Sequence, residues 1–136
     1  MMKVIYTSGV FDLFHIGHLN LLKRARSMGD RLVVGLSTDH FVESYKGSRP
    51  VIPYNQRKEI LESIKYVDAV IRQNCVEKIR NMVDAGANVI VMGDDWKEKG
   101  IMGQETIIKS GKKIVYVPYT KGISTTEIRD WIKNEN

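Results

Sequence analysis

Short apolar segments alternate with amphipathic segments along the whole chain, and this alternation restricts the fold more than any other feature. The apolar segments have the character of strands buried on both faces, whereas the segments between them place apolar residues three and four positions apart, as helices do. Strands separated by helices form parallel sheets with right-handed crossovers and helices on both faces. The sequence therefore predicts an α/β protein with a five-stranded parallel sheet.

The expected elements follow from the periodicity of each segment. Strands are expected at residues 4–6, 31–37, 69–71, 88–92 and 113–117, and helices at residues 19–28, 55–66, 76–85, 106–110 and 125–133. The polar stretch 38–53 is expected to be a loop. We interpret residues 1–136 as a single Rossmann-like domain with helices on both faces, in which a ligand binds beyond the carboxyl ends of the strands.

The composition excludes several classes of protein. The net charge is +5, from 21 Lys and Arg against 16 Asp and Glu, but the basic residues are spread along the chain, so we expect no nucleic acid partner. No segment approaches the roughly 20 apolar residues of a membrane span, and the N-terminus has no signal-peptide pattern. A single cysteine, Cys75, excludes an internal disulfide framework. We therefore expect a cytoplasmic protein without membrane insertion.

The stretch GVFDLFHIGH, at residues 9–18, follows the first expected strand and enters a helix. The N–H groups and the dipole of a helix N-terminus favour an anion there. Gly17 leaves room for a phosphate, and the imidazoles of His15 and His18 can each donate a hydrogen bond to it. Transfer of a nucleotidyl group requires such positioning and charge neutralisation rather than a protein nucleophile. The alternatives are a helix-capping pair without a ligand and a metal site, but the third histidine, His40, is remote in sequence.

The stretch KGISTTEI, at residues 121–128, follows the last expected strand and begins another helix. A single hydroxyl is sufficient for an N-cap, and Ser124 or Thr125 can supply it. Three consecutive hydroxyls after a glycine exceed that need, and the additional donors suit the phosphates of a nucleotide. Because this stretch, GVFDLFHIGH and the loop 93–96 all follow strands, we expect them at the same edge of the sheet.

Four segments together, GVFDLFHIGH, KYVDAVI, VMGDDW and KGISTTEI, resemble the cytidylyltransferase family, and most closely its bacterial glycerol-3-phosphate cytidylyltransferases. The resemblance covers nearly the whole chain in the same order. It implies an enzyme that transfers CMP from CTP to a phosphorylated alcohol, first of all glycerol 3-phosphate, and releases pyrophosphate. It also implies a homodimer that requires Mg²⁺, held mainly by the triphosphate and not by a protein metal site.

The resemblance further implies roles for individual residues. His15 and His18 would stabilise the transition state, and Lys46 would reach over the phosphates. Arg57, Lys65 and Lys46 would bind the acceptor, and the position of Arg57 in the first turn of a helix, where a cation opposes the dipole, also indicates function. The nucleotide-binding residues would be Gly9, Val10, Phe11, Asp12, Gly17, Asp94, Asp95, Trp96, Thr120, Ser124 and Thr125.

The chain departs from the family pattern at two places. The usual Arg-Thr-Glu-Gly-Ile-Ser-Thr-Thr has become Tyr-Thr-Lys-Gly-Ile-Ser-Thr-Thr, so that Tyr119 replaces an arginine. Because tyrosine cannot bind phosphate with a charged, bidentate contact, Lys121 is a candidate to supply the missing charge. The usual Arg-Tyr-Val-Asp begins here with Lys65, and the tryptophan that often follows has no counterpart near Asn74.

These departures leave alternatives open. The acceptor could be another polyol phosphate, phosphocholine, phosphoethanolamine or a phosphonate. An adenylyltransferase of the same fold, using ATP, fits the first motif equally well. A nucleotide-binding regulatory domain is the alternative outside the enzymes. The pair of histidines argues against it, because a helix N-terminus alone is sufficient for binding.

Overall fold

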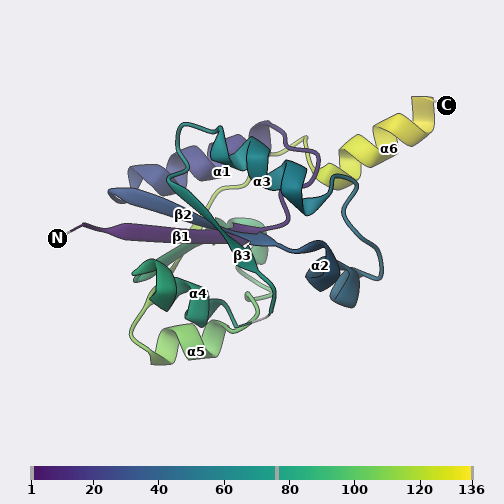
Figure 1. Cartoon of the computed structure of the whole chain (residues 1–136). Helices are drawn as coiled ribbons and strands as arrows, with labels where there is room; N and C mark the ends of the chain where they lie inside the picture. Colours follow the sequence, from purple (N-terminus) through teal and green to yellow (C-terminus); the bar gives the residue numbers. More distant parts are fainter. Residues whose placement is uncertain (1, 76, 136) are drawn as a thin grey trace.

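The computed structural model describes residues 2–75 and 77–135, and in them five strands form one all-parallel sheet (Figure 1). The strands are β1 (Val4–Gly9), β2 (Arg31–Ser37), β3 (Ala69–Gln73), β4 (Val89–Gly93) and β5 (Lys113–Val117). Their order is β3-β2-β1-β4-β5, so the chain moves outward from β1 to β3 and then returns to the other side of β1. The predicted α/β fold with a five-stranded parallel sheet is confirmed, and the strand order reverses between β1 and β4.

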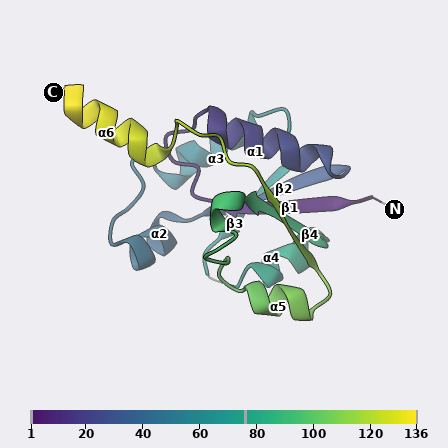
Figure 2. The ribbon, with the colours of Figure 1, turned by 180° about the vertical axis from the view of Figure 1, so that it is seen from behind.

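Helices cover both faces of the sheet (Figures 1 and 2). Helices α1 (Ile16–Ser27) and α3 (Tyr54–Glu62) lie on one face, and α4 (Lys78–Ala85) and α5 (Gln104–Lys109) lie on the other. Alternate strand residues point to opposite faces, so Ile5 packs in the core beneath α1 and α3 while Tyr6 packs in the core beneath α4 and α5. These two buried layers fix the carboxyl edge of the sheet in place.

The stretch 38–53 is not a loop throughout, and that prediction was wrong. Helix α2 (Asp39–Lys46) begins after Thr38, whose hydroxyl accepts from Phe41 N, and ends at Gly47 in the left-handed conformation with φ 81°. Val42 is the buried residue of this helix, so the helix buries little apolar surface. The cap residues at both ends, Thr38 and Gly47, could have indicated this helix in the sequence.

The other boundaries differ by a few residues. Helix α1 starts three residues earlier than expected because His15 caps it, and α3 ends at Glu62 rather than at residue 66. The expected helix 76–85 corresponds to α4, although Val76 lies outside the described residues. The loop after β4 contains a short 3₁₀ helix, η1 (Asp94–Trp96).

Helix α6 (Thr125–Glu135) projects from the rest of the molecule, with the C-terminal end far from the sheet (Figures 1 and 2). None of its described residues is buried, and the exposed fraction of Trp131 is 51%. Arg129 joins the first turns of α6 to the body through an ion pair with Asp12. Among the described helices, none combines the length and the apolar character that crossing a membrane requires.

Candidate active site

A cavity of about 410 Å³ lies at the carboxyl ends of the central strands, where the strand order reverses. Its volume is in the range typical of small-molecule sites. The walls come from the end of β1, the first turns of α1, α4 and α6, the last turn of α2, and η1. Of the predicted site residues, those that line it are Gly9, Val10, Phe11, Asp12, His15, Gly17, His18, Lys46, Asp95, Trp96, Thr120, Ser124 and Thr125.

The two histidines cap helix α1 reciprocally. His15 Nδ1 accepts from Gly17 N at 3.0 Å, and His18 Nδ1 accepts from His15 N at 3.1 Å. The rings stack, with centroids 3.8 Å apart. Because each Nδ1 is an acceptor, each neutral ring carries its proton on Nε2. Capping therefore uses only the Nδ1 atoms of the two histidines. Each ring keeps its Nε2–H as a donor for a ligand in the cavity.

Both rings are held in the neutral form. Burial, followed by the charge of His15, lowers the pKa of His18 to about 3. Partial burial also lowers the pKa of His15, against a smaller opposing effect of Glu127. The rings of Phe11 and Phe14, each 5.3 Å from the ring of His18, form the apolar surroundings. The histidines are thus arranged as neutral hydrogen-bond donors and not as cations.

Gly17 is required by the histidine beside it. A Cβ atom at this position would lie 2.8 Å from His15 Cε1, closer than side chains approach one another. From the sequence, this glycine is expected to leave space for a phosphate. The structure adds that the imidazole of His15 also needs that space in order to cap the helix.

Asp12 fixes the loop after β1. Its carboxylate accepts from Leu13 N, Val51 N and Ile52 N at 2.7–3.1 Å and pairs with Arg129 Nη2 at 2.9 Å. Its side chain is almost completely buried. One carboxylate therefore ties together three segments that are distant in sequence: the first motif, the chain before α3, and α6.

The backbone on each side of Asp12 is strained. Phe11 has φ 52° and Leu13 has φ 50°, in the left-handed region that residues other than glycine rarely adopt. Such conformations persist where the surrounding contacts enforce them, and they concentrate at functional sites. The contacts of Asp12 provide that enforcement here.

The hydroxyls of the second motif have distinct contacts. Ser124 Oγ accepts from Glu127 N at 3.1 Å and caps α6, while Thr125 Oγ1 donates to the carbonyl oxygen of Asp12 at 2.7 Å. Thr120 Oγ1 accepts from Asn20 Nδ2 at 2.9 Å. The hydroxyl of Thr125 thus connects the two motifs. This contact places the N-termini of α1 and α6 at the same cavity.

Lys46 and Arg129 are among the exposed cations that line the cavity. Lys46 ends α2, and Arg129 lies on α6 with its side chain 45% exposed. Although Lys46 is largely exposed, partial desolvation and then repulsion by Arg129 lower the pKa of its ammonium, against the attraction of Asp12. An anion between the two side chains would relieve this repulsion.

The loop after β4 contributes less than expected. Asp95 and Trp96 line the cavity, but Asp94 does not. Asp94 Oδ1 instead accepts from Tyr119 N at 3.1 Å, which joins η1 to the chain after β5. Asp94 thus has a structural contact, and its predicted role in binding the nucleotide stays a prediction.

Arg57 is also corrected from an acceptor-binding residue to a structural one. Its side chain is completely buried, and its guanidinium donates to the carbonyl oxygens of Ile52, Val10 and Ser37 and to Asp39 Oδ1, at 2.6–2.9 Å. It does not line the cavity. The cost of a cation in the first turn of a helix is offset by these partners, which the sequence could not reveal.

Lys65 lies away from the cavity. It is exposed in the turn between α3 and β3, at the amino end of the strands, whereas the cavity is at their carboxyl end. Its Nζ lies 5.2 Å from the centre of the Tyr66 ring. Within one chain, the predicted contact of Lys65 with the acceptor is therefore not formed.

Several residues that line the cavity were not predicted from the sequence, among them Ser8, Ser37, Lys78 and Arg129. Arg129 was detectable, since it lies one helical turn after Thr125 and so on the same side of α6. Lys78 is a cation in the first turn of a helix, which is the feature that indicated a function for Arg57. The same reasoning could therefore have identified Lys78. Ser8 and Ser37 end buried strands and had no distinguishing pattern.

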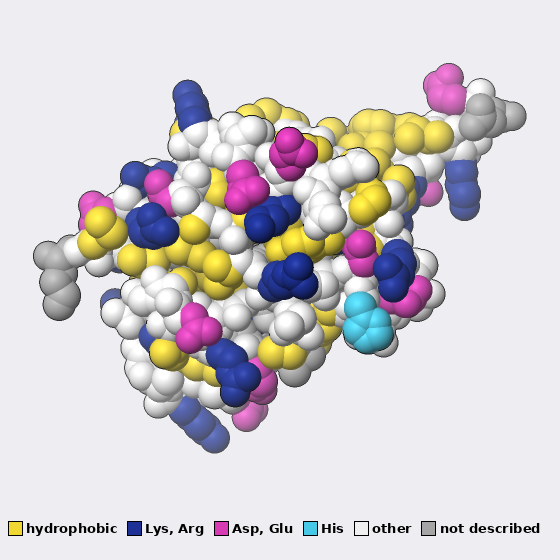
Figure 3. Space-filling view, viewed as in Figure 1, with side chains coloured by type: hydrophobic (Ala, Val, Ile, Leu, Met, Phe, Trp, Pro, Cys, Tyr) yellow, Lys and Arg dark blue, Asp and Glu magenta, His cyan; other side chains and the backbone are white. Residues whose placement is uncertain are grey.

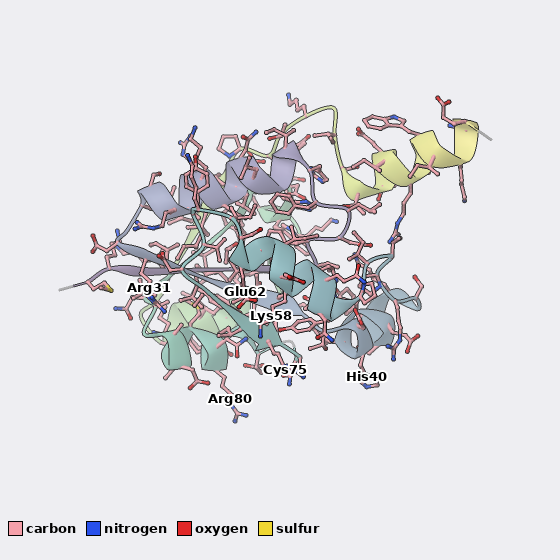
Figure 4. The ribbon with its side chains drawn as sticks, turned by 45° about the horizontal axis from the view of Figure 1, so that its top comes forward. Arg31, His40, Lys58, Glu62, Cys75 and Arg80 are labelled. Carbon is pink, nitrogen blue, oxygen red and sulfur yellow. The ribbon has the colours of Figure 1, made fainter. Side chains whose placement is uncertain are left out.

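The described residues contain no cluster of three or more His, Cys, Asp or Glu that could hold a metal ion. His40 is exposed and points outward from α2 (Figure 4). Lys and Arg side chains are interspersed with Asp and Glu on the face shown in Figure 3, without a continuous basic surface there.

Comparisons with known proteins agree with this geometry. A family model described as cytidylyltransferase-like matches residues 6–130. The chain is 45% identical to the glycerol-3-phosphate cytidylyltransferase of Bacillus subtilis, over 96% of this chain and 98% of the relative. It is 43% identical to the enzyme of the same name from Staphylococcus aureus, over 94% and 93%.

More distant relatives share the same fold. The chain is 36% identical to the bifunctional protein HldE of Koribacter versatilis, of which it covers 26%. The solved structure of a lipopolysaccharide core biosynthesis protein from Thermoplasma volcanium superposes with a TM-score of 0.73 at 27% identity, over 88% of this chain and 100% of that one. The fold, the two motifs at one cavity and the full-length relatives show that this chain belongs to the cytidylyltransferase-like family.

Proposed function

We propose that this protein is a CTP-dependent nucleotidyltransferase that transfers CMP from CTP to glycerol 3-phosphate and releases pyrophosphate. The observation that carries the proposal is the pair of neutral Nε2–H donors of His15 and His18, fixed at the N-terminus of α1 and directed to a cavity that α6 also bounds. The full-length relatives named glycerol-3-phosphate cytidylyltransferase support the choice of both substrates.

The arrangement suits an in-line displacement. A phosphate oxygen of the acceptor forms a bond to the α-phosphorus of CTP while the bond to the pyrophosphate oxygen breaks. Negative charge then grows on the leaving oxygens, where the donors of His15 and His18 stabilise it. Lys46 and Arg129, at the mouth of the cavity, neutralise the remaining charge of the triphosphate.

A divalent cation is part of this proposal. The carboxylate of Asp12 is already engaged by three backbone donors and Arg129, and no metal-binding cluster is found among the described residues. We propose that Mg²⁺ is held mainly by the triphosphate oxygens, as magnesium commonly is. When bound, Mg²⁺ would neutralise charge on the triphosphate and favour departure of pyrophosphate.

We also propose that the protein is a homodimer and acts in the cytoplasm. Apolar side chains exposed on helices, Ile16 at 50% and Trp131 at 51%, support association with a second copy. The exposed free thiol of Cys75 suits a reducing compartment. Light scattering tests the first point: a mass near 15.5 kDa, that of one chain, would contradict the dimer.

The proposed reaction is tested by measuring pyrophosphate release with Mg²⁺, crossing CTP and ATP against glycerol 3-phosphate, phosphocholine and phosphoethanolamine. We expect release with CTP and glycerol 3-phosphate. Release with ATP alone would identify an adenylyltransferase. No release with any pair, although CTP binds, would favour a nucleotide-binding domain without catalysis.

A further inference from the structure

The segment between β5 and α6, residues 118–124, runs past α1 to the cavity (Figure 2). It lies outside helices and strands, and side chains of other elements hold it. Asp94 Oδ1 accepts from Tyr119 N at 3.1 Å, and Asn20 Nδ2 donates to Thr120 Oγ1 at 2.9 Å. Among the described residues, the second contact is the one hydrogen bond between α1 and this segment. Asn20 thus holds a cavity residue although it does not line the cavity itself.

Thr120 lies against the turn of α1 that carries both histidines. A Cβ atom built at Gly17 would lie 3.6 Å from Thr120 Cβ, an ordinary contact distance. Gly17 belongs to the same turn as His15 and His18, and all three line the cavity together with Thr120. The hydroxyl of Thr120 is therefore placed next to the part of the cavity that the N-terminus of α1 bounds.

The bond from Asn20 determines what the hydroxyl of Thr120 can offer to a ligand. A hydroxyl has one hydrogen to donate and two lone pairs to accept with, whereas the nitrogen of an amide side chain only donates. The contact with Asn20 Nδ2 therefore occupies a lone pair of Thr120 Oγ1 and leaves its hydrogen unused. No group among the described residues accepts that hydrogen, so it remains available to an acceptor atom in the cavity.

Thr125, in the same motif, shows the opposite arrangement. Its Oγ1 donates to the carbonyl oxygen of Asp12 at 2.7 Å, so its hydrogen is already used within the protein. Two threonines that line the same cavity thus differ in the direction of their hydrogen bonds. The partner of each hydroxyl, and not the residue type, decides whether it can donate to a ligand.

The ligand atom that matches the hydroxyl of Thr120 is a hydrogen-bond acceptor. CTP carries such atoms on its phosphates and on its cytidine part, and Thr120 is one of the predicted nucleotide-binding residues. A donor that the protein has already oriented needs no rearrangement when the nucleotide binds, which lowers the cost of binding.

We propose that Asn20 is a positioning residue of the nucleotide site: its amide holds Thr120 by the oxygen and thereby directs the hydroxyl hydrogen to an acceptor atom of the nucleotide. This inference rests on the proposed function. It assigns a role to an exposed residue outside both phosphate-binding motifs and outside the residues that the resemblance implies.

The decisive variant is Asn20→Asp, tested by calorimetric titration of CTP with Mg²⁺. A carboxylate only accepts, so the hydroxyl of Thr120 must donate to it, and the bond is kept with its direction reversed. Asn20→Ala removes the bond and leaves the hydroxyl free to turn. We expect Asn20→Ala to raise the Kd for CTP about threefold and Asn20→Asp to raise it about tenfold. If Asn20 only held the segment in place, Asn20→Asp would be the milder variant, and that order would overturn the inference.

Two controls separate the direction of the bond from the added charge. In Thr120→Val, which has no hydroxyl, Asn20→Asp should raise the Kd less than about twofold further, since only a screened exposed charge changes. Lys23→Gln, on the exposed side of α1, lowers the net charge by the same amount and should also change the Kd less than about twofold. An equal effect of Asn20→Asp with and without the hydroxyl would overturn the inference. Because Asn20 and Lys23 are exposed, the midpoint of urea unfolding should not move in these variants.

Titration of inorganic tripolyphosphate identifies the acceptor atom. If Asn20→Asp weakens tripolyphosphate as much as CTP, the acceptor is a phosphate oxygen, and if it weakens CTP alone, the acceptor belongs to the cytidine part. Both results support the positioning role. Measurement of pyrophosphate release separates this inference from the proposed function. A native protein that releases pyrophosphate, but whose Kd for CTP Asn20→Asp leaves unchanged, overturns the role of Asn20 alone. A native protein that binds CTP with the expected order of variants, yet releases no pyrophosphate with any acceptor, overturns the proposed function alone.

Discussion

The two sides of the cavity are built differently. On the side of α1 and α6, nearly every polar side chain has its partner within the protein: Asp12 has four, Thr125 and Ser124 have one each, and both histidines are bonded through Nδ1. On the side of α4, Ser8 has no hydrogen bond and Lys78 has neither a hydrogen bond nor an ion pair from the described residues.

The difference separates two ways of preparing a site. The first side is preorganised, because its groups are oriented by the protein and need no rearrangement when charge develops on a phosphate. On the side of α4, by contrast, Ser8 and Lys78 have no such partners among the described residues. We associate the first side with the common reaction.

Two buried cations, Arg57 and Lys78, show the same difference between satisfied and unpaired polar groups. Each is a buried cation in the first turn of a helix. Arg57 donates four hydrogen bonds within the protein, and Lys78 has none from the described residues. Position on the helix therefore does not distinguish a structural cation from one that is available to a ligand.

The largest expected effect tests this pair. Arg57→Met should lower the free energy of unfolding by about 3–5 kcal/mol, because it leaves Asp39 and three carbonyl oxygens without their donor. Lys78→Met should change it by less than about 1 kcal/mol, since no partner is lost. Urea unfolding of both variants measures the contrast, and similar values for the two would contradict it.

The next effect concerns the preorganised side. His18→Ala should reduce kcat about 100- to 1,000-fold while the Kd for CTP stays within about tenfold, because the ring acts on charge that develops in the transition state. Single-turnover kinetics and calorimetry measure the two quantities, with the exposed His40→Ala as control. Parallel losses in binding and turnover would show that His18 mainly binds the ground state.

The pH dependence of stability should show how firmly the same ring is held neutral. The pKa of His18 is about 3, below its value of about 6.5 in the unfolded chain, so the unfolded state binds the additional proton between these values. Stability is therefore lost as the pH falls from about 6.5 toward 3. Between pH 7 and pH 5, His18→Asn should lose about 1–2 kcal/mol less stability than the unsubstituted protein in urea unfolding. Identical losses would mean that His18 titrates normally.

The smallest effect concerns the positive charge that is missing where Tyr119 replaces the arginine of the family pattern. Lys121 is exposed and does not line the cavity, whereas Arg129 does. We expect Arg129→Ala to raise KM for CTP about tenfold and Lys121→Ala to change it less than twofold, since an exposed cation at a distance is screened by salt. Steady-state kinetics with CTP as the varied substrate decides between them. A larger effect of Lys121→Ala would place the compensating charge in the second motif.

The order of strands and helices could be predicted because it depends on short-range periodicity. The strand expected at residues 113–117 matches β5, and the strand expected at residues 31–37 matches β2, since each is a short, largely apolar run between polar turns. Helix α2 was missed because it buries little apolar surface, so its pattern resembled that of a polar loop.

Local sequence also encodes both phosphate-binding motifs. His15, Gly17 and His18 lie within one helical turn, and Ser124 and Thr125 lie within another, so their relative positions follow from backbone geometry at the start of a helix. The strand before each motif then brings both to the same edge of a parallel sheet.

Only the tertiary structure decided which of the other side chains face the cavity. Arg57 is structural because Val10 and Ser37, distant in sequence, surround its guanidinium, and Lys78 is available because nothing comparable surrounds its ammonium. Hydrogen-bond partners of this kind are assembled by the packing of segments on the sheet. No pattern within one segment records them. The phosphate side of the site can therefore be predicted from the sequence, while the side of α4 requires the fold.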